Sequence, residues 1–117
     1  MRQVATALVT ATRDPDARVR QQSATALGRL VSPATMTRDI SIRLRELART
    51  DPNILVRGAA LASDIRLEKN AAIPLAKQLM ATDVWQSVIR APAVNALKEA
   101  GTPEALQLAQ QYAPPTQ

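Results

Sequence analysis

The chain has 117 residues, enough for one domain of ordinary size, and carries a net charge of +5. Its composition is 46% hydrophobic but only 2% aromatic, so its core must be built from Ala, Leu, Val and Ile, a composition that favours helices over strands. The absence of Cys excludes disulfides and thiolate chemistry, and the absence of His removes the commonest general base and metal ligand.

Apolar residues at helical spacing predict seven helices joined by short loops. Asp-Pro pairs at 14–15 and 51–52 supply an N-cap and a first helical residue, and Asp83 caps the sixth helix. Pro92 lies inside that helix and predicts either a kink or a break into two helices. The expected ranges are 2–12, 15–30, 36–49, 52–67, a fifth helix after residue 70, 84–90 with its continuation, and 103–112. Residues 1–113 form a single domain, followed by a disordered tail at 114–117.

One phrase recurs along the chain. Residues 14–28 read D-P-x-x-x-V-R-x-x-x-A-x-A-L-G, and residues 51–61 read D-P-x-x-x-V-R-x-A-A-L. Residues 83–97 hold a looser copy, D-x-x-x-x-x-I-R-x-x-A-V-x-A-L. Because a unit of this length cannot bury its own apolar face, its copies must stack side by side. Short loops between antiparallel helices then predict an all-α, right-handed α-solenoid (an α–α superhelix) of about three and a half repeats.

This phrase resembles the HEAT repeat in its short, bacterial-type form. The resemblance implies an aspartate in the turn between the two helices of a repeat and an arginine on the second helix, which together form a polar ladder between repeats. It places Asp14, Asp51 and Asp83 at the turn position and Arg20, Arg57 and Arg90 at the ladder position. Independently, Arg20 falls on the apolar side of its helix, where an arginine needs an acidic or carbonyl partner. We expect these arginines to be structural; the alternative is that they contact a ligand.

The C-terminal part carries a narrower likeness. Residues 85–97 and 101–106 are similar to the helical C-terminal region of some bacterial M1-type aminopeptidases, in which HEAT-like helices follow the zinc catalytic domain. That family's zinc site is an H-E-x-x-H helix with a distal glutamate, and a chain without His can hold none of it. The likeness implies the accessory domain of a larger metallopeptidase, with a covalently preceding domain.

The surplus of positive charge lies in the first half, where residues 1–57 hold ten Arg against five acidic residues. Three arginines of the third expected helix fall within about 40° of each other on a helical wheel, opposite its apolar stripe. With two arginines near the first helix they would form a basic strip suited to the backbone of DNA or RNA. The strip comprises Arg2, Arg13, Arg38, Arg45 and Arg49, and a solvated arginine face is the alternative. As a surface residue, Arg45 would be replaceable by alanine at a cost below about 0.5 kcal/mol.

No catalytic grouping follows from the sequence. Without His, only a lysine could activate a serine, and none stands at Ser-x-x-Lys spacing. There is no Gly-rich phosphate loop and no calcium-type loop, so we expect neither a cofactor nor a metal. Trp85 is either a plug between repeats or an interface anchor. The sequence therefore predicts a non-catalytic, cytoplasmic interaction or scaffold module with a protein partner and no membrane segment, with nucleic-acid binding as the alternative.

Overall fold

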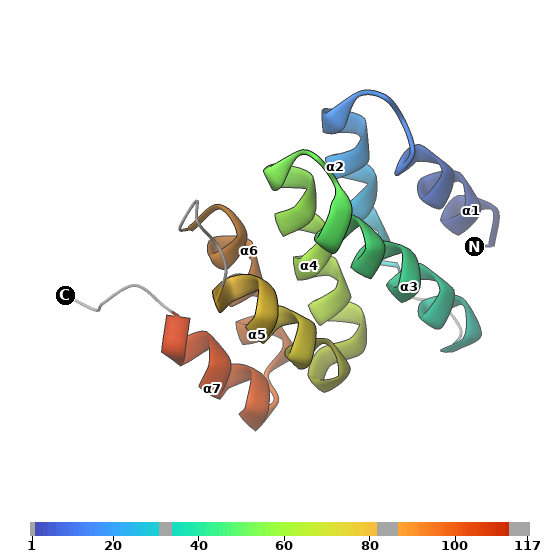
Figure 1. Cartoon of the computed structure of the whole chain (residues 1–117). Helices are drawn as coiled ribbons and strands as arrows, with labels where there is room; N and C mark the ends of the chain where they lie inside the picture. Colours follow the sequence, from blue (N-terminus) through green and yellow to red (C-terminus); the bar gives the residue numbers. More distant parts are fainter. Residues whose placement is uncertain (1, 31–33, 82–86, 113–117) are drawn as a thin grey trace.

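The computed structural model describes residues 2–30, 34–81 and 87–112 (Figure 1). The secondary structure in these ranges is entirely helical, as the composition predicts, and comprises seven α-helices and one short 3-10 helix. The helices are α1 (Arg2–Ala11), α2 (Ala17–Leu27), α3 (Ala34–Thr50), α4 (Ile54–Glu68), η1 (Lys69–Ala72), α5 (Ile73–Ala81), α6 (Ser87–Ala100) and α7 (Pro103–Tyr112). None of these helices is long and apolar enough to cross a membrane.

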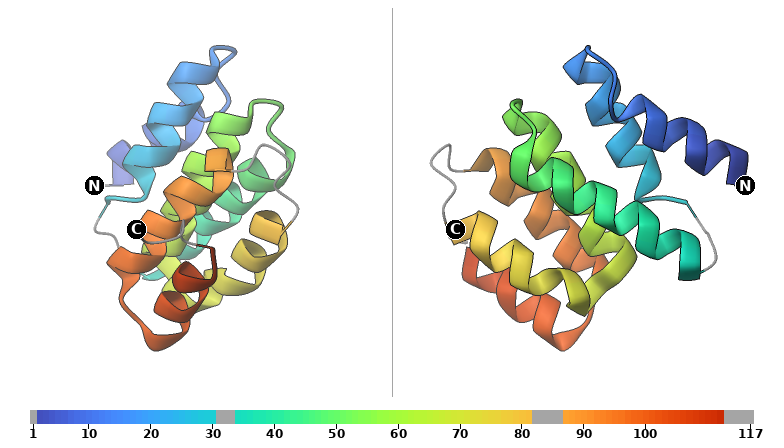
Figure 2. Two further views of the ribbon diagram at one scale, coloured as in Figure 1. Left: turned by 90° about the vertical axis from the view of Figure 1, so that its left-hand side faces the viewer. Right: turned by 45° about the vertical axis from the view of Figure 1, so that its right-hand side comes forward.

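The helices alternate between two directions. In Figure 1 the odd-numbered helices run roughly parallel to one another, and the even-numbered helices run across them. Helix α4 packs against α2 on one side and α6 on the other, while α1 and α3 pack against α2 and α4 respectively. Helix α7 closes the C-terminal end against α6 and α5 (Figure 2). As a result the three even-numbered helices begin at one edge of the molecule and end at the opposite edge.

Helix α4 lies at the centre of the core, because it packs against α2, α3 and α6. Residues 60–65 of this helix are all buried, including the polar pair Ser63 and Asp64. On α3 the expected apolar stripe is confirmed, since Ile40, Leu44, Leu47 and Ala48 are at most 3% exposed. Small alanines on α2, α4 and α6 let these helices approach closely, which compensates for the scarcity of aromatic side chains.

Helices α2 and α4 approach each other closely. Gly28 follows the last residue of α2, and the Ser63 hydroxyl of α4 donates a hydrogen bond of 2.6 Å to the Ala24 carbonyl of α2. A Cβ at residue 28 would lie 2.6 Å from the Ser63 Cβ and 2.8 Å from its Cα. The φ of Gly28, −69°, is accessible to any residue. The glycine is therefore required by the close packing against Ser63 and not by its backbone conformation.

Pro92 lies within a single helix, so the expected alternative of two separate helices is wrong. The proline is the sixth residue of α6, where its missing N–H forfeits one bond to the carbonyl four residues earlier. Ile89, three residues before the proline, and Ala93, directly after it, are almost completely buried against the neighbouring helices. Burial of this face is what holds the helix together across the lost bond.

Candidate interaction surface

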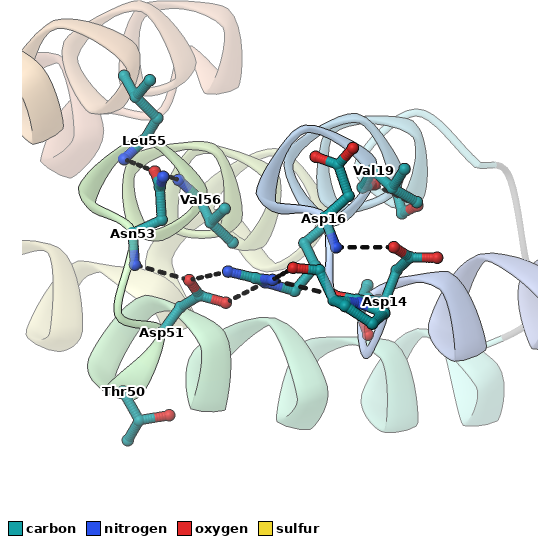
Figure 3. A network of polar contacts seen from close by, with 12 residues as sticks. Asp14, Asp16, Val19, Thr50, Asp51, Asn53, Leu55 and Val56 are labelled. Atoms are coloured by element: carbon teal, nitrogen blue, oxygen red, sulfur yellow. Dashed lines mark hydrogen bonds and ion pairs between the residues drawn. The ribbon is translucent and has the colours of Figure 1, made fainter.

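The two Asp-Pro turns differ from the expected N-caps. Asp16 caps α2 and Asn53 caps α4, each accepting backbone N–H bonds from the first turn of its helix. The side chain of Asp14 instead accepts the Asp16 N–H at 2.8 Å, and that of Asp51 accepts the Asn53 N–H at 2.9 Å. Each turn is thus an Asx turn followed by a separate cap, because the aspartate reaches its own backbone two residues later. Figure 3 shows the two turns next to each other.

Asp51 also accepts hydrogen bonds from Arg20 of α2, in the preceding helix pair. Arg20 Nε donates to Asp51 Oδ2 at 2.9 Å and Arg20 Nη2 donates to Oδ1 at 3.2 Å (Figure 3). A further nitrogen of Arg20, Nη1, donates to the carbonyls of Asp14 and Pro15. The hydrogen bond to Asp51 is the main cause that raises the pKa of Arg20. Because the side chains are only 14% and 4% exposed, this pair ties the turn before α4 to α2.

The two later arginines bind carbonyls. Arg57 Nε donates to the Ala48 carbonyl at 2.9 Å, and Arg90 Nε donates to the Met80 carbonyl at 2.9 Å. Both carbonyls belong to the last turn of the preceding odd-numbered helix, where the helix leaves its carbonyls without internal partners. Arg90 also lies over the ring of Tyr112, 5.1 Å from its centroid. Asp83 lies outside the described residues.

We expect Asp51→Asn to lower the free energy of unfolding by about 1 kcal/mol, because asparagine keeps one acceptor but turns an NH2 group toward the donors of Arg20. Asp16→Asn is the matched control. Asparagine caps a helix as well as aspartate does, so its effect should stay within about 0.5 kcal/mol. Urea denaturation measures both values, and equal effects would contradict the role of Asp51 in joining the turn before α4 to α2.

The arginines of the expected basic strip do not share one environment. Arg13, Arg38 and Arg49 are exposed. Arg45 is not a free surface residue: its Nε donates to Asp64 Oδ2 at 2.9 Å, and its Nη2 donates to the Ala71 carbonyl at 3.4 Å. The side chains of Arg2 and Trp85 lie outside the described part of the structure. The expectation of a solvated Arg45 is wrong because α4 and η1 cover one flank of α3.

Asp64 is a buried carboxylate held by two partners. Its side chain is fully buried, and besides Arg45 it accepts a hydrogen bond from the Ser41 hydroxyl of α3. Burial raises the pKa of Asp64, while the hydrogen bonds from Ser41 and Arg45 work in the opposite direction. Within the described residues no buried side-chain nitrogen or oxygen lacks a hydrogen-bond partner. This network therefore joins α3 to α4, and the Asp64 carboxylate is not accessible from the surface.

A second group of charges, which the sequence did not indicate, lies where the even-numbered helices end. We call it the basic groove; it has a volume of about 280 Å³ and is lined by Gly28, Arg29, Arg66, Lys69, Glu99 and Ala100. Arg66 Nε donates to Glu99 Oε2 at 2.7 Å, which joins α4 to α6. No sequence motif marks this groove, because its residues come from three segments that become neighbours only in the folded chain.

A larger and more apolar groove separates α1 from α3. It has a volume of about 410 Å³ and is lined by Ala5, Thr6, Val9, Thr10, Met36, Asp39 and Ile40. Arg43 crosses between the two helices nearby, donating from Nε to the Thr12 hydroxyl at 2.9 Å and from Nη2 to the Thr12 carbonyl at 3.1 Å. These bonds fix the spacing of α1 and α3 at one end of the groove.

Comparison with known proteins identifies a single repeat. The HEAT repeat family model matches residues 4–33, which span α1 and α2. Comparison with curated proteins and with solved structures found no match. HEAT repeats in general mediate protein interaction or scaffolding and are generally non-catalytic.

Proposed function

We propose that this chain is a non-catalytic interaction or scaffold module, built as a short, right-handed α-solenoid of HEAT-like helix pairs. The observation that carries the proposal is the Arg20–Asp51 pair, which links the HEAT-matched segment to the next helix pair through the two recurring residue types. Arg57 and Arg90 stand at the corresponding positions of the recurring phrase and donate to carbonyls at the ends of α3 and α5, which supports a repeating unit. A stack of this kind offers an extended surface for a partner.

The use of the polar side chains supports a binding role. The buried ionic pairs, Arg20 with Asp51 and Arg45 with Asp64, are occupied in joining helices. The sequence contains neither His nor Cys. The remaining charged groups lie mostly on the surface, where they suit recognition of another macromolecule. Nucleic-acid binding along α3 is the weaker candidate, because Arg45 is committed to Asp64 and the exposed arginines of that helix are separated from each other by it.

A narrower form of the proposal is that the module is the C-terminal helical domain of an M1-type metallopeptidase. Its support is the likeness of residues 85–97 and 101–106 to that region. In this form the partner is the covalently preceding catalytic domain, and the zinc chemistry belongs entirely to that domain. The two forms differ in one measurable property, the mass of the native polypeptide.

Paired size measurements on a source-cell lysate test the proposal. An antibody against this domain gives the polypeptide mass after denaturing electrophoresis and the assembly size after gel filtration of the native lysate. We expect the native species to be much larger than the polypeptide, and larger than the purified chain on the same column. Native and polypeptide masses that are both near the 12.6 kDa of this chain would contradict a partner-binding role.

The same measurements separate the narrower forms. A polypeptide several times heavier than the 12.6 kDa of this chain supports the peptidase accessory domain. A band near that mass rules it out. If nuclease treatment reduces the native size, nucleic acid holds the assembly together and the protein-interaction proposal fails.

A further inference from the structure

The basic groove combines cations whose charge is only partly balanced. Arg66 is paired with Glu99, whose pKa is lowered mainly by its hydrogen bond with Arg66, then by the charges of Arg66 and Arg29. Arg29 and Lys69 are exposed, and neither makes a hydrogen bond or ion pair with its side chain among the described residues. Two positive charges therefore remain available in the groove beside one neutralised pair.

Part of the positive charge in the groove can be explained by its position at helix ends. The groove lies at the C-terminal ends of α2, α4 and α6, which run roughly parallel in Figure 1, and cations are favourable at such ends. The charge of Lys69 fits this account, but its backbone conformation does not. Its φ of 51° and ψ of −117° lie in a region that glycine adopts far more readily, and it is the only non-glycine residue with positive φ in the described ranges. A lysine held there at a conformational cost points to a use for its ammonium group.

We propose that the basic groove binds an acidic segment of a partner protein, with one carboxylate of that segment held by Arg29 and Lys69. The proposal deepens the proposed interaction function and rests on it. An arginine can bind a carboxylate through two parallel hydrogen bonds, and a lysine adds a point charge. Gly28 and Ala100 complete the lining of the groove.

The dimensions and charges favour a carboxylate over a nucleic-acid backbone. A volume of about 280 Å³ accommodates one side chain or a chain terminus with its neighbours. A phosphate backbone requires cations repeated along a track, whereas this groove has two available cations next to the carboxylate of Glu99.

Nuclear magnetic resonance titration of the ¹⁵N-labelled chain at low salt tests the proposal, with a hexaglutamate peptide as the probe. We expect the amide signal of Gly28 to shift and to saturate, while that of Gly58, inside α4, stays in place. The double variant Arg29→Gln/Lys69→Gly should bind the peptide at least tenfold more weakly. The matched control, Arg38→Gln/Arg49→Gln, removes the same charge from α3 and should change affinity by less than twofold.

A second readout separates binding from structure. Lys69→Gly alone should raise the melting temperature, because glycine relieves the backbone strain, and should still weaken peptide binding. The proposal is overturned if the peptide does not bind at millimolar concentration, if the α3 control weakens binding as much, or if six-nucleotide oligothymidylate binds the groove more tightly than the peptide. If the native assembly described above persists while the groove variant loses nothing, the module has a partner but the groove is not its site.

Discussion

Arg45→Ala should lower the free energy of unfolding by about 3 kcal/mol at neutral pH, since it leaves a fully buried carboxylate without its cation. Asp64 has no solvent exposure, whereas the side chain of Arg45 is 31% exposed. The variant therefore destabilises the fold because Asp64 stays buried and retains only the hydrogen bond from Ser41. This effect should exceed that of Arg57→Ala, because the Arg57 side chain donates its hydrogen bond to the neutral carbonyl of Ala48, a contact worth about 1 kcal/mol.

The deficit of Arg45→Ala should depend on pH in a defined direction. Burial already raises the pKa of Asp64, and removing Arg45 removes both its hydrogen bond and its charge, which lower that pKa. The folded variant then binds a proton more tightly than the unfolded chain, whose Asp pKa is about 3.9. The penalty is therefore small below this value, and it grows as the pH rises toward the raised pKa of the folded variant.

Urea denaturation at acidic and neutral pH, on the wild type and the variant, measures this trend. Arg49→Ala is the control, because Arg49 lies on the same helix and is exposed, and its effect should stay within about 0.5 kcal/mol. Adding Asp64→Asn to Arg45→Ala should recover part of the loss, since no charge is then buried while Ser41 keeps an acceptor. A loss for Arg45→Ala no larger than for Arg49→Ala would show that the buried pair contributes nothing.

The helices could be predicted from the sequence because their signals are local. The spacing of apolar residues gave the helices, and the stripe of α3 is buried as expected. The placement of Arg20 on an apolar face led to the expectation of an acidic or carbonyl partner, and the structure supplies Asp51 together with two turn carbonyls. These are contacts within one helix pair or between neighbouring pairs.

The errors arose where a local pattern had two physical solutions. An aspartate before proline can cap a helix or form an Asx turn, and only the position of the next polar residue, Asp16 or Asn53, decides between them. Arg45 was expected to be solvated because a helical wheel shows the apolar stripe of its own helix but not the helix that covers its flank. Asp64, within the buried run of α4, was the available signal, since a carboxylate in an apolar segment requires a cation.

The basic groove could not be derived from the sequence at all. Arg29, Arg66 and Glu99 are spread over 71 positions (29 to 99), and each looks like an ordinary charged residue near a helix end. They meet because α2, α4 and α6 end at the same edge, which is a property of how the helix pairs stack. A site of this kind depends on the register between α2, α4 and α6, and the register of α2 against α4 is set by contacts such as the hydrogen bond of Ser63 to the Ala24 carbonyl.

Gly28→Ala tests that register, and we expect it to lower the free energy of unfolding by about 2 kcal/mol. Two effects compete. Alanine restricts the unfolded chain and would stabilise the protein by about 0.4–1 kcal/mol, because the φ of −69° suits it. Its Cβ, however, would lie 2.8 Å from the Cα of Ser63, so that α2 and α4 must separate, and overpacking of this kind costs about 1–3 kcal/mol or more. The steric effect wins because neither the Cβ nor the Cα of Ser63 can move away by rotation of the side chain.

A double-mutant cycle identifies the clash as the cause. Ser63→Gly removes the hydroxyl and Cβ that the new methyl group meets, although it also loses the bond to the Ala24 carbonyl and places glycine inside a helix. Gly28→Ala/Ser63→Gly should therefore be more stable than the sum of the single effects predicts, by about 1 kcal/mol. Thermal and urea denaturation give the four free energies. Additive effects, or a stabilised Gly28→Ala, would mean that α2 and α4 are not in the close contact that aligns the ends of the even-numbered helices.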